Sequence, residues 1–142
     1  MAKDLIIGAF TNYKINQLKP WINSIKETVF TGDIVLIAVN SDQHTVDDIQ
    51  QAGVRVVKAT NENNMMIHML RFLHIYNFLK LYGHEYRYVI TTDVRDVIFQ
   101  TNPSDYVQNV FGSRSTGIMA QSEAIKIKDE AWNRDNIIKN FG

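Results

Sequence analysis

Two aspartates three positions apart, Asp93 and Asp96, form the pattern in this sequence that most clearly indicates chemistry. They follow an apolar run at residues 86–90 and precede a second one at residues 97–99. Carboxylates placed between two buried segments lose hydration free energy unless a partner compensates for it. A divalent cation could bind both, with phosphate oxygens and water completing an octahedral shell. Alternatively, Arg95 could neutralise one of them in a structural ion pair.

Polar residues that follow two other apolar runs are further candidates for ligand binding. Thr11, Asn12 and Tyr13 follow the first run of the chain, and Asn40 follows the second. In an open parallel sheet, ligands bind at the carboxyl ends of the strands, where the strand order reverses. These residues could therefore reach a ligand. The alternative is that they form turns and helix caps, which Asn, Ser, Thr and Asp favour in any protein.

The elements that must position these side chains can be predicted from the apolar pattern. The first two runs are continuous rather than alternating, which is typical of strands covered on both faces. Strands are predicted at residues 5–10, 33–39, 54–57 and 86–90. Helices are predicted at residues 21–29, opened by Pro20, at 45–52, stopped by Gly53, and at 64–82. Alternating strands and helices predict an α/β fold, a Rossmann-like three-layer sandwich with a mostly parallel central sheet.

The helix predicted at residues 64–82 is apolar around most of its circumference, which is typical of a helix wedged between two layers. A polar stripe on it contains His68 and His74, which we interpret as part of a solvated edge, and also Arg71. Beyond residue 103 the pattern weakens, and it predicts a helix at 104–111, a strand at 117–121 and a helix at 132–140. We expect a single domain over residues 1–142 that is truncated at its C-terminus.

Composition excludes several classes of protein. Of the 142 residues, 45% are hydrophobic and 21% charged, which excludes a disordered chain. The 15 basic and 15 acidic side chains leave no net charge, so non-specific binding to nucleic acid lacks its driving force. Without cysteines there is no disulfide, Cys-ligated zinc or thiol catalysis. No apolar run approaches the roughly 18 residues of a membrane span, and we expect a soluble, cytoplasmic protein.

Sequence signatures of several common enzyme classes are absent. The first apolar run is not followed by GxGxxG, and the sequence contains no GxxxxGK[ST]. Dinucleotide dehydrogenases and P-loop enzymes use these glycine-rich segments to bind phosphate. The sequence also lacks the GxSxG turn that carries the nucleophilic serine of α/β-hydrolases. These enzyme classes are therefore not supported.

Residues 86–103 resemble the block of GT-A glycosyltransferases in which a hydrophobic strand leads into an acidic DxD motif and a second hydrophobic strand. This chain has Asp-Val-Arg-Asp at residues 93–96, where the family has Asp-x-Asp. Counted back from Pro103, Asp96 falls at the family's metal-binding position, whereas Asp93 fits better when counted forward from the strand. The resemblance covers nearly the whole chain, but the family's C-terminal half is missing from the pattern.

The resemblance implies a metal-dependent glycosyltransferase, or its donor-binding half, in which Asp93 and Asp96 hold Mn²⁺ or Mg²⁺ on the diphosphate of a nucleotide-sugar donor. A hydroxyl of a glycan or another acceptor then attacks the anomeric carbon. It also implies that Asp93 binds the metal or the donor ribose and that Arg71 reaches the donor phosphate or sugar. The nucleotide-binding edge would contain Thr11, Asn12, Tyr13 and Asn40.

Two other functions stay open at this point. A non-catalytic nucleotide-binding or interaction module could keep the same fold without turnover, as the missing C-terminal half suggests. A nucleotidyltransferase would share the Rossmann-like layer and the paired acidic metal ligands. It is less well supported, because residues 10–13 lack the glycine-rich, basic loop that such enzymes carry after the first strand.

Overall fold

The computed structural model describes residues 2–112, 117–120, 126 and 129–141, and the chain divides into two compact units, Met1–Gly112 and Ser113–Gly142. The first unit contains the strands β1 (Lys3–Thr11), β2 (Asp33–Val39), β3 (Arg55–Ala59) and β4 (Tyr86–Thr91). Its helices are α1 (Ile15–Glu27), α2 (Gln43–Gln51), α3 (Ile67–Tyr82), the short 3₁₀ helix η1 (Gly83–Glu85) and α4 (Pro103–Phe111). The second unit contains α5 (Ala131–Phe141). The prediction of one domain over residues 1–142 stays a prediction.

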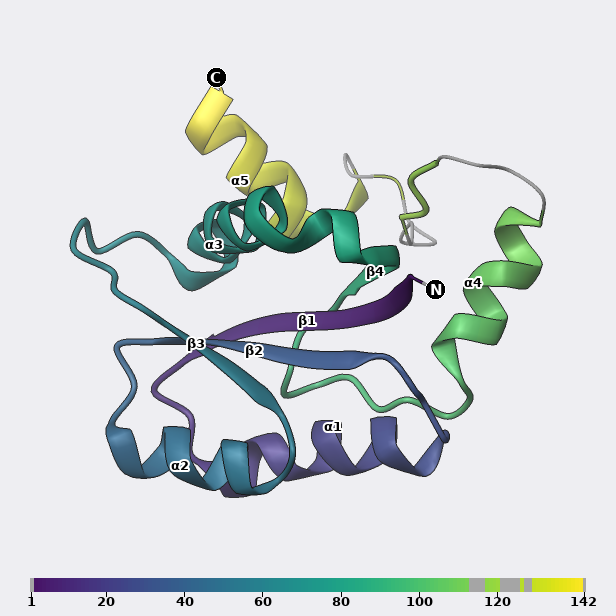
Figure 1. The fold of residues 1–142 in the computed structure, drawn as a ribbon. Helices are drawn as coiled ribbons and strands as arrows, with labels where there is room; N and C mark the ends of the chain where they lie inside the picture. Colours follow the sequence, from purple (N-terminus) through teal and green to yellow (C-terminus); the bar gives the residue numbers. More distant parts are fainter. Residues whose placement is uncertain (1, 113–116, 121–125, 127–128, 142) are drawn as a thin grey trace. The chain divides into compact units, whose positions relative to one another are not determined.

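The four strands form the parallel middle layer of an α/β three-layer sandwich, which confirms the predicted Rossmann-like fold. Figure 1 shows α1 and α2 on one face of the sheet and α3 on the other. The strand order is β3-β2-β1-β4. The chain therefore moves outward from β1 through β2 to β3 and then returns to place β4 on the other side of β1. The strand order reverses between β1 and β4.

The core consists of two apolar clusters, one on each face of the sheet. Alternate side chains of β1 enter opposite clusters, because side chains of a strand point to the two faces in turn. Ile6 packs with Trp21 in one cluster, and Leu5 packs with Phe78 in the other. All three apolar side chains Leu5, Ile6 and Ile7 are fully buried. The continuous apolar runs of the sequence are therefore explained by helices on both faces of the sheet.

Helix α1 begins at Ile15, ahead of the predicted residue 21, and Pro20 lies inside it rather than at its start. The start is set by Gln17, whose side-chain Oε1 accepts a hydrogen bond of 3.1 Å from the backbone N–H of Lys14. Leu18 is fully buried in the first turns, and this burial favours the longer helix. The helix tolerates Pro20 at the loss of one intrahelical hydrogen bond.

Helix α3 is not buried on all sides, so the prediction of a helix wedged between two layers is wrong for the described residues. Leu70, Ile75 and Phe78 are buried in the cluster on the α3 face of the sheet. On the other side, apolar residues are 49 to 61% exposed: Met69, Phe72, Leu73 and Tyr76. Within residues 2–112, the sheet packs against one side of α3, and residue type alone does not tell which side that is.

Two predicted segments of strand differ from the structure. Residues 117–120 form no strand, and residue 121 lies outside the described residues. The apolar residues 97–99 are also not part of the sheet. The backbone N–H of Phe99 instead donates a hydrogen bond of 3.1 Å to Oγ of Ser24 in α1. In the described part of the chain, no helix is both long enough and apolar enough to cross a membrane.

Asp4 in β1 is a buried carboxylate, 6% exposed, whose partner lies 83 positions away in β4. Arg87 donates hydrogen bonds from Nε and Nη2 to the two carboxylate oxygens, at 3.0 and 2.9 Å. Burial opposes ionisation of Asp4, but the hydrogen bonds from Arg87 and Ser104 and the charge of Arg87 outweigh it and lower the pKa of Asp4. This pair joins the first strand to the last strand of the sheet.

We expect Asp4→Asn to lower the free energy of unfolding by about 1–2 kcal/mol at pH 7, because a bidentate charged hydrogen bond is lost while water still reaches Arg87. Since the pKa of Asp4 is lower in the folded state, this stabilisation is complete above the unfolded value of 3.8 and is lost as the pH falls through the folded-state pKa. Urea unfolding of both proteins at neutral and acidic pH measures it. A difference that does not shrink on acidification would contradict the assignment.

Candidate functional site

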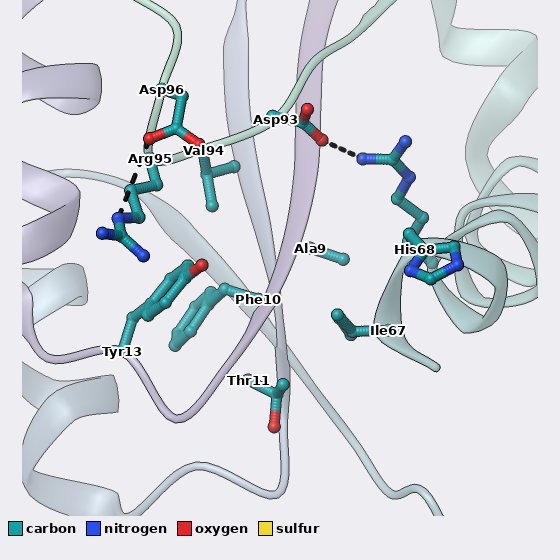
Figure 2. A pocket seen from close by; sticks show the side chains of 11 residues that line it. Ala9, Phe10, Thr11, Tyr13, Ile67, His68, Asp93, Val94, Arg95 and Asp96 are labelled. Carbon is teal, nitrogen blue, oxygen red and sulfur yellow. Dashed lines mark hydrogen bonds and ion pairs between the residues drawn. The ribbon is translucent and has the colours of Figure 1, made fainter. Parts of the chain in front are cut away.

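A pocket of about 230 Å³ lies at the carboxyl ends of β1 and β4, where the strand order reverses. Figure 2 shows that its side chains come from the end of β1, the residues after it, the start of α3 and the loop after β4. Five lining residues were predicted from the sequence: Thr11, Tyr13, Arg71, Asp93 and Asp96. The other lining residues are Ala9, Phe10, Ile67, His68, Val94 and Arg95.

The loop after β4, residues 92–99, is called the acidic loop here because it carries Asp93 and Asp96. Thr91, the last residue of β4, pairs with Ile7 of β1. Asp93 follows two residues later, and parallel pairing therefore brings it to the level of the last residues of β1. The register of the sheet thus explains why the acidic loop and the end of β1 share one pocket.

Gly8 allows the acidic loop to lie directly against β1. Val94 is 3% exposed and packs above this glycine. A Cβ atom on Gly8 would lie 2.2 Å from Cγ1 of Val94 and 3.2 Å from the carbonyl oxygen of Thr92. Atoms cannot approach so closely in a packed core. A glycine inside a strand indicates a close approach of this kind. Gly8, inside the first apolar run, is therefore the residue in the sequence that could have indicated this contact.

Each carboxylate of the pocket lies beside an arginine. Asp93 forms an ion pair with Arg71 of α3, and Oδ1 of Asp96 lies 3.7 Å from Nε of Arg95. The side chains of Asp93 and Asp96 are 61% and 82% exposed. The expected desolvation of these two carboxylates is therefore wrong. The acidic loop buries Val94 and leaves both aspartates at the surface of the pocket.

Arg71 has hydrogen-bonding capacity beyond its ion pair. Its Nη1 donates to Oδ1 of Asp93, while its Nε is buried and has no hydrogen-bond partner among the residues that the structure describes. The guanidinium group has five N–H donors in a planar arrangement that matches carboxylate and phosphate oxygens. Arg71 lines the pocket, and the N–H groups of its Nη1 and Nη2 can donate to a ligand there.

The opposite wall of the pocket is aromatic (Figure 2). The rings of Phe10 and Tyr13 are stacked, with centroids 6.5 Å apart and an angle of 5° between their planes. The guanidinium carbon of Arg95 lies 5.7 Å from the centre of the Tyr13 ring. A hydrogen bond with Tyr13 and the negative charges of Tyr13 and Asp96 raise the pKa of Arg95. This wall therefore combines a flat apolar surface with a permanent positive charge.

The N-terminus of α3 also faces the pocket through Ile67 and His68. The residue before the helix, Met66, provides no side-chain hydrogen bond to the first turn. The free N–H groups and the helix dipole make such a terminus favourable for an anion. Together with the two arginines, it supplies positive potential beside the two carboxylates.

Asn12 and Asn40 do not line this pocket. Both have positive φ angles, 59° and 50°, which asparagine tolerates in tight turns. Oδ1 of Asn40 accepts a hydrogen bond of 3.2 Å from the backbone N–H of Asn61, and its own N–H donates to Ala59. For Asn40 the structure thus shows the turn role that the sequence left open as an alternative.

The two aspartates fit some cations better than others. Among the described residues there is no group of three or more His, Cys, Asp or Glu side chains that could hold a metal ion. Structural zinc sites need such a complete set of protein ligands. Mg²⁺ usually keeps several waters and uses one or two carboxylates together with substrate phosphates. Asp93 and Asp96 therefore fit a hard cation that binds together with a phosphate ligand.

No family model matches this sequence, and searches of curated proteins and of solved structures found no match either. The function is therefore inferred from the geometry of the pocket.

Proposed function

We propose that the pocket between β1 and β4 binds the diphosphate of a nucleotide-sugar donor together with Mn²⁺ or Mg²⁺. In this proposal the chain is a metal-dependent glycosyltransferase, or the donor-binding part of one. The observation that carries it is the presence of two carboxylates and two guanidinium groups at the reversal of the strand order. Open α/β sheets bind their ligands at this position.

The alternation of charges in the pocket supports a ligand that is itself a cation paired with an anion. Arginines favour phosphate oxygens, whereas carboxylates repel them unless a cation lies between. The pairs Arg71–Asp93 and Arg95–Asp96 place both kinds of group within one pocket. A metal-bound diphosphate can satisfy all four side chains, whereas a free anion or a free cation can satisfy two.

The residues of the pocket have separate roles in the proposed reaction. The acceptor hydroxyl oxygen forms a bond to the anomeric carbon as the bond from that carbon to the diphosphate breaks. The diphosphate leaves with the electron pair, and the hydroxyl proton is released to water. When bound, the cation stabilises the negative charge of the leaving diphosphate. Arg71 donates hydrogen bonds to the phosphate oxygens. The partly exposed ring of Tyr13, which stacks on the buried ring of Phe10, offers a surface for the nucleobase.

The ion pairs favour a second candidate, a nucleotide-binding module without transferase activity. Asp93 and Asp96 already have arginine neighbours, which a structural role would also require. Incubation with a panel of nucleotide sugars distinguishes the two candidates, provided that both transfer to acceptors and hydrolysis of the donor are followed. Turnover supports the transferase, and binding without turnover supports the module.

We expect UDP to bind the wild-type protein and to bind more tightly when Mn²⁺ is added, with the gain reversed by a chelator. Asp96→Ala should weaken the Mn²⁺-supported binding of UDP by about tenfold, which is at the low end of the loss of affinity seen when a group around a metal is removed. Calorimetric titration measures both effects. Asp105→Ala, which removes an exposed aspartate of α4 outside the pocket, is the matched control. Equal UDP affinity in wild type and Asp96→Ala would refute the metal site.

A further inference from the structure

We propose that helix α1 fixes the acidic loop in place and that Trp21, Ser24 and Thr92 are positioning residues for the two aspartates. This inference rests on the proposed function, because it concerns the same pocket. None of the three side chains lines the pocket. They would act on a ligand through the position of Asp93 and Asp96.

The first anchor lies at the start of the acidic loop. Nε1 of Trp21 donates a hydrogen bond of 3.0 Å to Oγ1 of Thr92, the residue directly before Asp93. The indole of Trp21 is 0% exposed and is enclosed by the core cluster of α1. The indole N–H can only donate, and a buried donor without an acceptor is costly. The indole therefore holds the Thr92 side chain at a defined place.

The second anchor lies at the end of the acidic loop. Oγ of Ser24 accepts a hydrogen bond of 3.1 Å from the N–H of Phe99 and donates one of 2.8 Å to the carbonyl oxygen of Trp21. Ser24 is 5% exposed, so water does not compete well for these bonds. The Phe99 ring also meets the Trp21 ring edge-on, with centroids 6.4 Å apart. Both anchors come from one face of α1, since residues three apart on a helix are neighbours.

Between the anchors, Val94 is the buried residue of the acidic loop, whereas Asp93, Arg95, Asp96 and Ile98 are exposed. Val94 is buried against Gly8, while Asp93 and Asp96 contact arginine side chains at the surface. The ends of the loop and Val94 are therefore what restrain the two carboxylates. Holding ligand groups in the binding geometry before the ligand arrives reduces the entropy cost of binding.

The test compares three threonine variants. Thr92→Val removes the acceptor for Trp21 and keeps the branched shape, whereas Thr92→Ser keeps the acceptor. We expect Thr92→Val to weaken the binding of UDP with Mn²⁺ by about tenfold and Thr92→Ser to bind within about twofold of wild type. Thr28→Val is the matched control, because the Thr28 hydroxyl donates to the Ile25 carbonyl at the end of α1, at 2.7 Å, and Thr28 does not line the pocket.

Thermal unfolding of the same variants separates positioning from stability. A purely structural role would let Thr92→Val and Thr28→Val lower Tm alike, with the folded proteins binding UDP equally well. That result, or wild-type affinity in Thr92→Val, overturns the inference. Weaker binding in Thr92→Val alone, restored in Thr92→Ser, supports it.

Hydrogen exchange tests the anchors even if the proposed function fails. In Ser24→Ala, the amide of Phe99 should exchange about tenfold faster than in wild type, and amides of the acidic loop should also lose protection in Thr92→Val. If wild type does not bind UDP with Mn²⁺, the proposed function is wrong. Faster exchange in both variants would then still support the anchoring, whereas unchanged exchange overturns it.

Discussion

Gly8→Ala is expected to lower the free energy of unfolding by about 2–3 kcal/mol and to weaken the binding of UDP with Mn²⁺ by more than about tenfold. The new Cβ would lie 2.2 Å from Cγ1 of Val94, far inside contact distance. β1 is paired on both sides and cannot move, so the acidic loop has to shift. Asp93, next to Val94, shifts with it. Urea unfolding and calorimetric titration measure the two effects.

A double variant and a second glycine show whether this contact is the cause. In Gly8→Ala/Val94→Ala the clashing Cγ1 is gone, and the remaining Cβ of residue 94 lies at an ordinary distance of 3.7 Å. The double variant should therefore be more stable than the sum of the single effects predicts. Gly83→Ala is the control, since its Cβ would lie 3.7 Å from Leu79. If Gly8→Ala has the same free energy of unfolding as wild type, Val94 does not lie as close to Gly8 as described.

Arg71→Gln is expected to change the affinities for anion and cation in opposite directions. UDP with Mn²⁺ should bind roughly a hundredfold more weakly, because charged hydrogen bonds to phosphate are lost. Mn²⁺ alone should bind several-fold more tightly, because the carboxylate of Asp93 no longer has a guanidinium partner. The Arg71–Asp93 ion pair thus couples the two ligands. Phosphate bound to Arg71 frees Asp93 for the cation, and a cation bound to Asp93 frees Arg71 for the phosphate.

Titrations of Mn²⁺ alone and of UDP at saturating Mn²⁺ measure the two affinities of Arg71→Gln. Arg134→Gln removes an arginine that pairs with Asp135 in α5 and is the control for a general loss of positive charge. Both affinities should stay at the wild-type level in this control. A decrease of both affinities in Arg71→Gln would refute the coupling and assign Arg71 a structural role.

The fold could be predicted from the sequence because its two central strands, β1 and β2, are buried on both faces. The continuous apolar runs at residues 5–10 and 33–39 correspond to β1 and β2, with small differences at the ends. The start of α1 could not be predicted from Pro20, because the cap at Gln17 and the burial of Leu18 outweigh one lost hydrogen bond. Which side of α3 is exposed could not be predicted either, since apolar residues occur on both sides of the helix.

The candidate site was partly predictable for a related reason. The carboxyl ends of parallel strands meet at one edge, and this rule led to Thr11, Tyr13 and Asp93, which line one pocket. The same rule led to Asn40, whose side chain instead binds the backbone of the next loop. The bond from Trp21 to Thr92 joins residues 71 positions apart and leaves no pattern in the sequence.

The central place of β1 has a consequence for the order in which the chain assembles on the ribosome. β1 is synthesised before the other three strands of the sheet but needs β4 as its second neighbour, and Arg87 follows its partner Asp4 by 83 residues. At bacterial or eukaryotic translation speeds this delay is on the order of ten seconds. Until β4 has been made, the edge of β1 that pairs with it lacks its partner, and unpaired strand edges favour aggregation. The pocket also needs the acidic loop, so it is completed only after the strands β1, β2, β3 and β4 have been made.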